Sequence, residues 1–176
     1  MPIDTKRIIS RQLGLLLRQK GLDQITVTEL VEVCGISRQA FYYHFQDIID
    51  AMEWGCEQKI RKILRASMNA ACIEDAVSVY IGFFTEDRPE IRSLLNSRLH
   101  DTSLTLLTGS IRSWLRALQL QQRSADTSSE IEAFALDLYS NGICQILLKE
   151  AGKSEESDRL LVERISAAVR GELKLF

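Results

Sequence analysis

A short stretch near the N-terminus, residues 38–44, gathers side chains whose types suit contact with DNA. It reads RQAFYYH and contains no acidic residue. Arg38 can donate two hydrogen bonds to guanine O6 and N7, and Gln39 can pair with adenine N6 and N7. Ala40 is small enough to allow close approach to a base edge or a thymine methyl group. The remaining polar members can donate hydrogen bonds to phosphate oxygens: Tyr42, Tyr43 and His44.

Some aromatic residues of this stretch also suit a protein core. Phe45, just after it, is expected to be a core residue, and Tyr42 fits the core and a DNA-facing surface equally well. Tyr43 and His44 are adjacent and are expected to face outward. The apolar positions expected to pack the stretch against its neighbours are Leu30, Val31, Cys34, Ile36 and Phe41.

Two short helices must position these side chains. One is predicted over about 28–34 and the other over about 38–44, and Gly35 permits a tight turn between them. Ser37 is a natural N-cap of the second helix and is assigned to the same DNA-facing surface. Two such helices meeting across a turn with Gly are typical of a helix-turn-helix. Two hydroxyl residues could cap the first helix beside N–H groups that suit phosphate: Thr26 and Thr28.

The rest of the chain shows the apolar periodicity of helices, and no segment has that of strands. The chain has 176 residues with only two prolines and nine glycines, which leaves long stretches without a helix breaker. We therefore predict an all-α protein of about nine helices, with a polar loop from Gln121 to Ser129. The further helices are expected over about 4–19, 47–67, 74–85, 88–98, 102–120, 130–151 and 155–174.

Composition excludes several classes of protein. The net charge is −2, and residues 1–65 hold ten Lys or Arg against eight Asp or Glu, so any DNA contact must depend on local placement of charge. No P-loop, G-x-S-x-G or H-E-x-x-H motif occurs, and with two His residues an enzyme is not expected.

Apolar runs are too short for a membrane span, and the charged start of the chain does not read as a secretory signal, which indicates a cytoplasmic protein. The cysteines form no C-x-x-C pair, so we expect no metal site, no cofactor and buried free thiols: Cys34, Cys56, Cys72 and Cys144.

Residues 7–52 resemble the N-terminal DNA-binding domain of the TetR/AcrR family of bacterial transcriptional regulators. The resemblance implies a domain over 1–46 that binds a palindromic DNA operator, and a helical effector-binding and dimerisation domain over 47–176 that forms a homodimer. Besides a basic and apolar first helix, the positions that match the family's spacing are Gly21, Thr26, Leu30, Gly35, Ile36, Ser37, Tyr42, His44 and Phe45.

The chain departs from the family pattern just after the motif. The family often places a phosphate-binding lysine at the start of the fourth helix, where this sequence has Ile48 or Ile49, and Val31 stands where a small alanine is usual. Loss of one phosphate contact in each subunit should lower affinity and flatten its salt dependence. Basic residues of the first helix could compensate: Lys6, Arg7 and Arg11.

The C-terminal region is expected to hold a mainly apolar pocket for a small-molecule effector, although aromatic residues at helical spacing are also typical of a core. Arg98, His100 and Asn141 could supply polar groups. The helix predicted over 130–151 is apolar on two faces, which suits a helix that contacts both its own core and a second subunit. The expected pocket residues are Phe83, Phe84, Leu95, Leu107, Trp114, Tyr139 and Cys144, and those of the dimer interface are Phe134, Leu138, Gly142, Ile146, Ile165 and Val169.

These features predict a ligand-responsive, DNA-binding transcriptional regulator, in the usual case a repressor. The alternative is a helical dimeric small-molecule sensor or adaptor that has lost specific DNA binding. The missing lysine and the nearly neutral N-terminal region favour that alternative.

Overall fold

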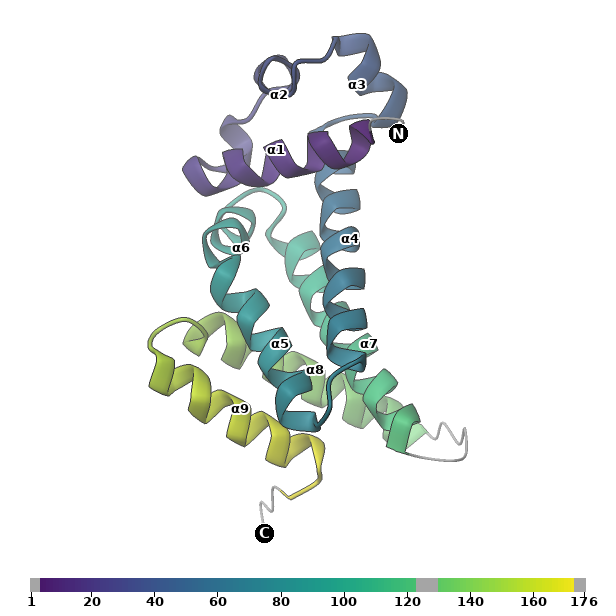
Figure 1. Ribbon diagram of the computed structural model, residues 1–176, viewed down its shortest axis with the longest axis vertical. Coiled ribbons are helices and arrows are strands. Elements are labelled where there is room, and N and C mark those ends of the chain that lie inside the picture. The colour runs from purple at the N-terminus through teal and green to yellow at the C-terminus, as the bar shows by residue number, and fades with distance from the viewer. Residues whose placement is uncertain (1–3, 123–129, 173–176) are drawn as a thin grey trace. The chain divides into compact units, whose positions relative to one another are not determined.

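The described residues of the chain, 4–122 and 130–172 in a computed structural model, form nine α-helices, one short 3₁₀ helix and no strand (Figure 1). The predicted all-α fold is therefore confirmed. The chain divides into two compact units by the contacts within each. The first comprises Met1–Arg61 and Pro89–Ser103, and the second comprises Lys62–Arg88 and Leu104–Phe176.

The first unit is built around α1 (Thr5–Gln19). Asp4 caps this helix by accepting a hydrogen bond from the backbone N–H of Arg7. The apolar residues of α1 recur at helical spacing, so they form one buried stripe that includes Ile9 and Leu13. The other elements with residues in this unit are η1 (Leu22–Gln24), α2 (Val27–Cys34), α3 (Arg38–His44), the first part of α4 (Ile48–Met68), α6 (Arg88–Leu95) and the start of α7 (His100–Gln122).

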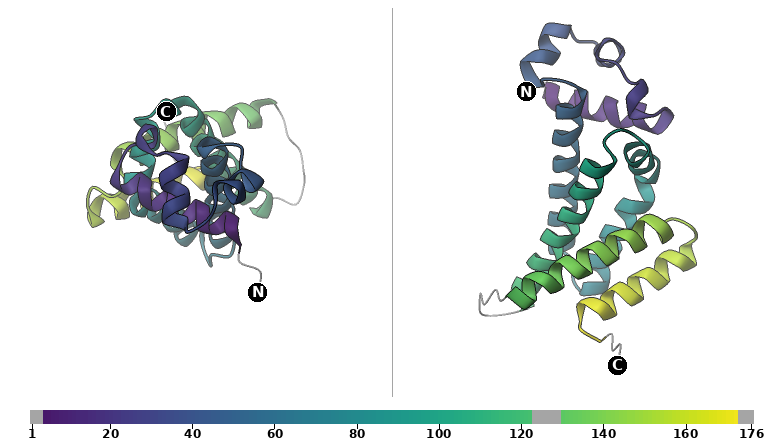
Figure 2. Two further views of the ribbon diagram at one scale, coloured as in Figure 1. Left: turned by 90° about the horizontal axis from the view of Figure 1, so that it is seen from above. Right: turned by 180° about the vertical axis from the view of Figure 1, so that it is seen from behind.

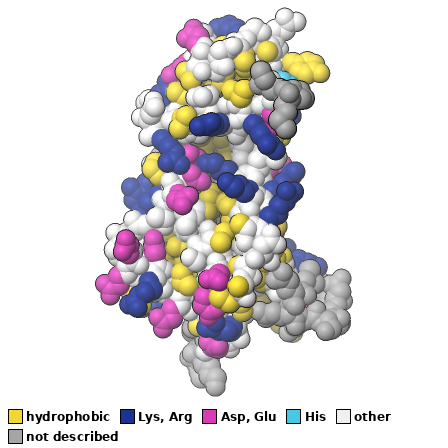
Figure 3. Space-filling model, viewed as in Figure 1, with side chains coloured by type: hydrophobic (Ala, Val, Ile, Leu, Met, Phe, Trp, Pro, Cys, Tyr) yellow, Lys and Arg dark blue, Asp and Glu magenta, His cyan; other side chains and the backbone are white. Residues whose placement is uncertain are grey.

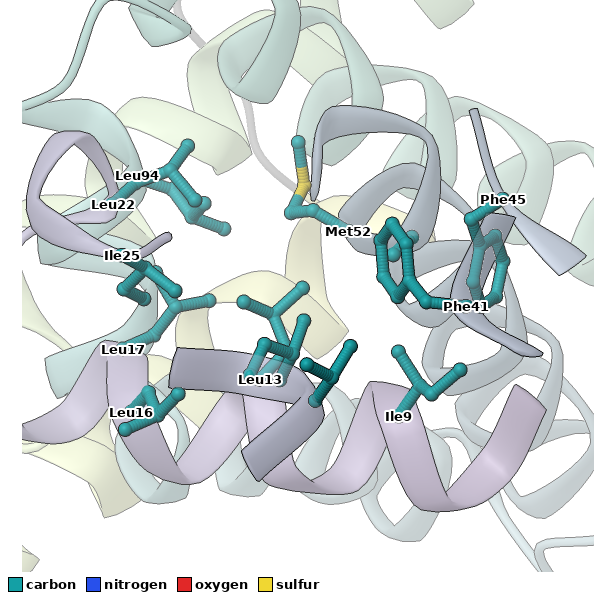
Figure 4. Packing of buried hydrophobic residues seen from close by; sticks show 13 residues of the cluster. Ile9, Leu13, Leu16, Leu17, Leu22, Ile25, Phe41, Phe45, Met52 and Leu94 are labelled. Carbon is teal, nitrogen blue, oxygen red and sulfur yellow. The ribbon is translucent and has the colours of Figure 1, made fainter. Parts of the chain in front are cut away.

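One hydrophobic core holds the elements of the first unit together (Figure 4). The stripe of α1 meets Leu30 of α2, Phe41 of α3 and Met52 of α4, and Leu94 of α6 joins the same cluster. Each of the short helices α2 and α3 is too short to be stable alone, so this shared burial is what fixes their relative orientation.

The second unit contains α5 (Ile73–Glu86), most of α7, α8 (Glu130–Glu150) and α9 (Glu155–Val169). Figure 2 shows α8 and α9 side by side. Trp114 of α7 is fully buried and stacks on Tyr80 of α5, with 4.4 Å between ring centroids. Its indole N–H donates to Ser67 Oγ at 2.6 Å, and the Tyr80 hydroxyl donates to the Ser110 carbonyl at 3.2 Å. Both buried polar groups are thus satisfied, as buried polar groups must be for stability.

The turn between α8 and α9 is fixed by polar contacts to α5 and to Arg88, the first residue of α6. Arg88 donates to the carbonyl oxygen of Ala151 at 2.5 Å. Asp158 accepts one hydrogen bond from the backbone N–H of Gly152 at 2.7 Å and another from the hydroxyl of Thr85 at 3.1 Å. Gly152 has a φ of 71°, a value that favours glycine.

The predicted helices agree with the observed ones to within a few residues, with some differences. The helix predicted over 88–98 ends at Leu95, and η1 was not predicted. The predicted loop starts too early, because α7 continues to Gln122, and residues 123–129 and the predicted end of the last helix at 173–174 lie outside the described residues. Cys72 is exposed rather than buried, because it caps α5 by accepting a hydrogen bond from the backbone N–H of Asp75.

The domain boundary at residues 46 and 47 stays a prediction. None of the described helices combines the length and the apolar character that crossing a lipid bilayer requires.

Candidate nucleic-acid interface

Local sequence signals fix the α2–α3 pair. The hydroxyl of Thr26 accepts a hydrogen bond from the backbone N–H of Glu29 at 3.2 Å and so caps α2. Ser37 caps α3 in the same way, by accepting from the backbone N–H of Ala40 at 3.1 Å. Between the helices, Gly35 has a φ of 65°, the left-handed conformation that ends many helices. Its backbone N–H donates to the Glu32 carbonyl at 3.1 Å. The predicted helix-turn-helix is therefore formed.

The helix α3 has one buried side and one exposed side. Phe41 is fully buried and the following Phe45 is 2% exposed, so these aromatics anchor α3 in the core. Tyr43 is 85% exposed and Tyr42 is 56% exposed, so the structure places Tyr42 outside the core. The other predicted contact residues of α3 are also reachable from solvent, since Arg38 and Gln39 are exposed while Ala40 and His44 are half-buried.

Arg38 and Thr28 link α3 to α2. A guanidinium N–H of Arg38 donates a hydrogen bond to the hydroxyl of Thr28, and both side chains lie at the surface. Among the described residues no carboxylate forms an ion pair with Arg38, although other arginines, such as Arg112 with Asp137, do form such pairs. The positive charge of Arg38 is therefore available to a ligand. Tyr43 and His44 meet edge to face with ring centroids 5.0 Å apart, so they form one projecting group.

The start of α4 carries negative rather than positive charge. Ile48 and Ile49 are half-buried, and Asp47 accepts a hydrogen bond from the backbone N–H of Asp50 at 2.9 Å. The Asp50 carboxylate in turn accepts from the backbone N–H of Gln46 at 2.9 Å. The departure from the family pattern thus leaves two acidic side chains committed to the backbone of this turn.

Lys6 supplies positive charge close to the end of α3. Its ammonium group lies 5.0 Å from the centroid of the Phe45 ring and 5.7 Å from that of Trp54. A cation over an aromatic face is attracted by the electrons of the ring, so these contacts hold the ammonium beside the residue that follows α3. On the face that Figure 3 shows, Lys and Arg side chains are mixed with Asp and Glu.

Glu90 is a polar residue of the first unit that the sequence did not single out. Its side chain is 11% exposed and accepts a hydrogen bond from Arg18 Nε at 2.7 Å and another from the ammonium group of Lys59. It also approaches Gly14 so closely that a Cβ there would lie 3.4 Å from its Oε1. Glu90 thereby connects α6 with α1 and α4. No sequence signal marks it, because an acid in the first turn of a helix is common.

The predicted effector-binding residues fall into two groups. Leu95 lies in the first unit with Arg98 and His100, whereas the other predicted lining residues lie in the second unit. Asn141 is exposed and donates to the Asp137 carbonyl at 2.8 Å. In the second unit the residues Phe84, Leu107, Trp114 and Cys144 are buried, Phe83 is half-buried and Tyr139 is exposed.

The buried members of this set pack as part of the second unit's interior. Burial raises the pKa of the Cys144 thiol, so the neutral thiol is the favoured form. A surface hollow of about 310 Å³ lies elsewhere in this unit, near Glu150, Ser157 and Arg164, and none of the predicted pocket residues lines it. The effector site therefore stays a prediction.

The residues predicted for the dimer interface give α8 an exposed apolar face. Phe134 is 68% exposed and Leu138 is 63% exposed, and Ile146 and Gly142 are also exposed. Ile131, which was not in the predicted set, extends the same face. On α9, Val169 is half-buried and Ile165 is buried within its own chain. A contiguous exposed apolar face is unusual for a surface that meets only water.

Comparison with known proteins gives three findings. Residues 16–48, which run from α1 to the first residue of α4, match the family model described as bacterial regulatory proteins, tetR family. No curated protein matches the chain. Two solved structures are similar in fold: the dihydroxyacetone kinase operon activator DhaS and the TetR family repressor AlkX from Dietzia sp. strain DQ12-45-1b.

The two structural likenesses extend over almost the whole chain. DhaS superposes with a TM-score of 0.76 at 17% sequence identity, with 99% of this chain and 98% of that chain covered. AlkX gives a TM-score of 0.56 at 21% identity, with 95% of this chain and 98% of that chain covered. At these low sequence identities, the two similarities show a shared fold and nothing further.

Proposed function

We propose that this chain is a transcriptional regulator of the TetR family, which binds a palindromic operator as a homodimer and releases it in response to a small-molecule effector. Regulators of this family act by binding DNA rather than by catalysis, in line with the expectation that the chain is not an enzyme. The observation that carries the proposal is the exposed side of α3. It presents Arg38, Gln39 and Tyr43 without any acidic residue, on a helix that Phe41 anchors in the core.

The chemistry of that side suits the major groove of DNA. An α-helix fits the groove, arginine pairs with guanine and glutamine with adenine, and hydroxyl groups donate to phosphates. Thr26 and Ser37 are engaged as helix caps, so their contribution is to fix α2 and α3 rather than to supply free hydroxyl groups. Arg38, Gln39, Tyr43 and His44 are therefore the residues on which we place base and phosphate contacts.

Two features support the proposed homodimer: the short half-site that one helix-turn-helix can read and the exposed face of α8. One helix-turn-helix reads a short half-site, and a two-fold dimer doubles the contacts across half-sites about 34 Å apart. The exposed apolar face of α8 around Phe134 and Leu138 is the surface that we assign to the second copy. A symmetric interface requires the same patch on both subunits, and a single helix face satisfies that condition.

The effector would act through the second unit. We place its site among the apolar side chains around Phe83, Phe84 and Trp114, where an apolar small molecule could displace packed side chains. The long helix α4 contributes residues to both units. A shift of α4 on effector binding would change the separation of the two reading helices, and affinity falls when both cannot dock together.

Repression is the mode of control that we propose, in the cytoplasm. AlkX is named a repressor and DhaS an activator, so the shared fold is compatible with either mode. Repression is the simpler mechanism because occupation of an operator that overlaps a promoter blocks transcription without any contact to the polymerase.

The decisive experiment measures binding of the purified protein to the promoter region nearest its own gene, by fluorescence anisotropy at low salt with and without competitor DNA. A sequence preference over the competitor supports the proposal. Equal affinity for both DNAs would refute it. The double variant Y43A/H44A should lose operator affinity with an unchanged circular dichroism spectrum, because Tyr43 is exposed and His44 is only half-buried.

The second candidate is a dimeric sensor or adaptor without specific DNA binding. The acidic turn at the start of α4 is the observation that favours it, because Asp47 and Asp50 flank Ile48 and Ile49, where the family often has a lysine. An adaptor should keep its activity in the Y43A/H44A variant, and no DNA fragment should compete for it.

A further inference from the structure

The hydrogen bond between Arg38 and Thr28 joins the two helices that the proposed function places against DNA. Arg38 is the first residue of α3, and Thr28 is the second residue of α2. Ten positions of sequence separate them, and the turn at Gly35 brings them together. The bond is therefore a product of the helix-turn-helix itself rather than of either helix alone.

The energetics of this bond favour a role in orientation over a role in stability. Both side chains are exposed, and water competes for an exposed donor and acceptor, so the net gain in folding stability is small. The two side chains differ in stiffness. Threonine is β-branched and has few rotamers, whereas arginine is long and has many. The stiff hydroxyl of Thr28 therefore restricts the conformations of the flexible Arg38 side chain.

Arg38 is the residue of α3 best suited to recognise a guanine. A guanidinium group has five N–H donors in a fixed planar fork, and a bidentate contact with guanine O6 and N7 uses two of them. One bond to Thr28 leaves enough donors for that contact. Arg38 has no carboxylate partner among the described residues, so Thr28 is the group that restrains it in the free protein.

We propose that Thr28 is a positioning residue that holds the Arg38 guanidinium in the orientation that reads a guanine, and that it thereby helps to set the sequence preference of this regulator. The inference rests on the proposed function, since it requires α3 to bind DNA. It differs from the expectation that Thr28 contacts phosphate, because a phosphate contact strengthens binding to every sequence equally.

The test uses a pool of double-stranded DNA with a randomised core of 24 base pairs between fixed ends. The pool is selected with the wild-type protein and with four variants, and the bound fraction is sequenced to give the preference at each base pair. T28V keeps the shape of the side chain and removes the acceptor. T28S restores the acceptor, and R38A removes the reading group.

T26V is the matched control. It removes a threonine hydroxyl from the same helix, but that hydroxyl caps α2 by accepting from the backbone N–H of Glu29 and does not contact Arg38. A purely structural effect of losing a hydroxyl should therefore appear in T26V as lower thermal stability and lower affinity for all sequences.

We expect R38A to abolish the preference for guanine at one position of each half-site. T28V should weaken the preference at that same position by about 3- to 10-fold, the factor that a single hydrogen bond is worth. T28S should restore the wild-type preference, and T26V should leave the relative preferences unchanged.

Four outcomes would overturn the inference. T28V could keep the full guanine preference and lose affinity evenly, which would assign Thr28 to a phosphate. T28V could behave as T26V does, which would make the bond structural. If the wild-type protein selects no sequence from the pool, the proposed function and this inference both fail. If the wild-type protein selects a sequence and T28V shows the same affinity and the same base preferences, only the inference fails.

Discussion

The Nε atom of Arg18 lies 2.7 Å from Oε1 of Glu90, and this ion pair joins the end of α1 to the first turn of α6. Lys59 of α4 pairs with the other carboxylate oxygen of Glu90. The carboxylate is mostly buried, whereas Arg18 and Lys59 are each about two-fifths exposed. One acidic side chain therefore joins three helices of the first unit, α1, α4 and α6.

Replacing Glu90 by Gln should lower the free energy of unfolding of the first unit by about 1–2 kcal/mol. Gln removes the negative charge that pairs with Arg18 and Lys59, and the exposure of these two cations to water limits the loss. Urea unfolding followed by circular dichroism measures the loss. The matched control is E57Q, which removes an exposed pair with Arg61 within α4 and should change stability by less than about 0.5 kcal/mol. Equal effects of the two substitutions would contradict the assigned role of Glu90.

Replacing Lys6 by Met should weaken binding to all DNA sequences by the same factor. The ammonium group held over Phe45 is the positive charge that we expect to replace the missing lysine of α4. Each lost phosphate contact reduces the slope of log affinity against log salt concentration by about 0.9 in magnitude. Titrations at several salt concentrations measure this slope. K153M, which alters a lysine of the second unit that pairs with Glu150, should leave it unchanged. A changed base preference in K6M would instead assign Lys6 to a base.

Replacing Leu138 by Glu should convert the proposed homodimer to a monomer with a mass near 20.0 kDa. Leu138 is 63% exposed on the apolar face of α8, and burial of a charge in an apolar interface is strongly unfavourable. Analytical ultracentrifugation measures the mass. The control is L15E, which places the same charge at an exposed leucine of α1 and should leave the dimer intact. A monomeric wild-type protein, or a dimeric L138E, would exclude α8 as the interface.

Replacing Gly35 by Ala should destabilise the first unit by about 1–2 kcal/mol, because an L-residue is strained at positive φ. Nothing lies within 4 Å of the position that a Cβ would occupy, so the cost is conformational rather than steric. Thermal unfolding measures it. Gly21 offers the control, since its φ is −65° and its surroundings are also open. G21A should be neutral or slightly stabilising, and a similar loss in both variants would refute the explanation.

The helix-turn-helix could be predicted from the sequence because its signals are local. The caps at Thr26 and Ser37 and the turn at Gly35 lie within a few residues of the backbone groups that they satisfy. The exposure of Tyr42 could not be predicted in the same way. Tyrosine suits both the core and the surface, and only the packing of Phe41 and Phe45 decides which side of α3 faces inward.

The ion pairs of Glu90 were beyond prediction because its partners are 72 and 31 positions away in the sequence. Nothing in a single sequence pairs charges at such separations. The effector site is a different case, because a buried aromatic such as Trp114 has the same spacing whether it lines a pocket or fills a core. Its stacking on Tyr80 and its hydrogen bond to Ser67 become visible only in three dimensions.

The two tryptophans of the chain fall one to each unit. Trp54 packs edge to face on Phe45, the residue that follows α3, with 5.9 Å between the ring centroids. Trp114 is buried in the interior of the second unit. Replacing either indole by Phe leaves a protein with a single tryptophan. The emission of Trp54 would then report DNA binding by the first unit, and the emission of Trp114 would report binding of an effector to the second unit. The rate of each binding step could thus be measured without attaching a dye.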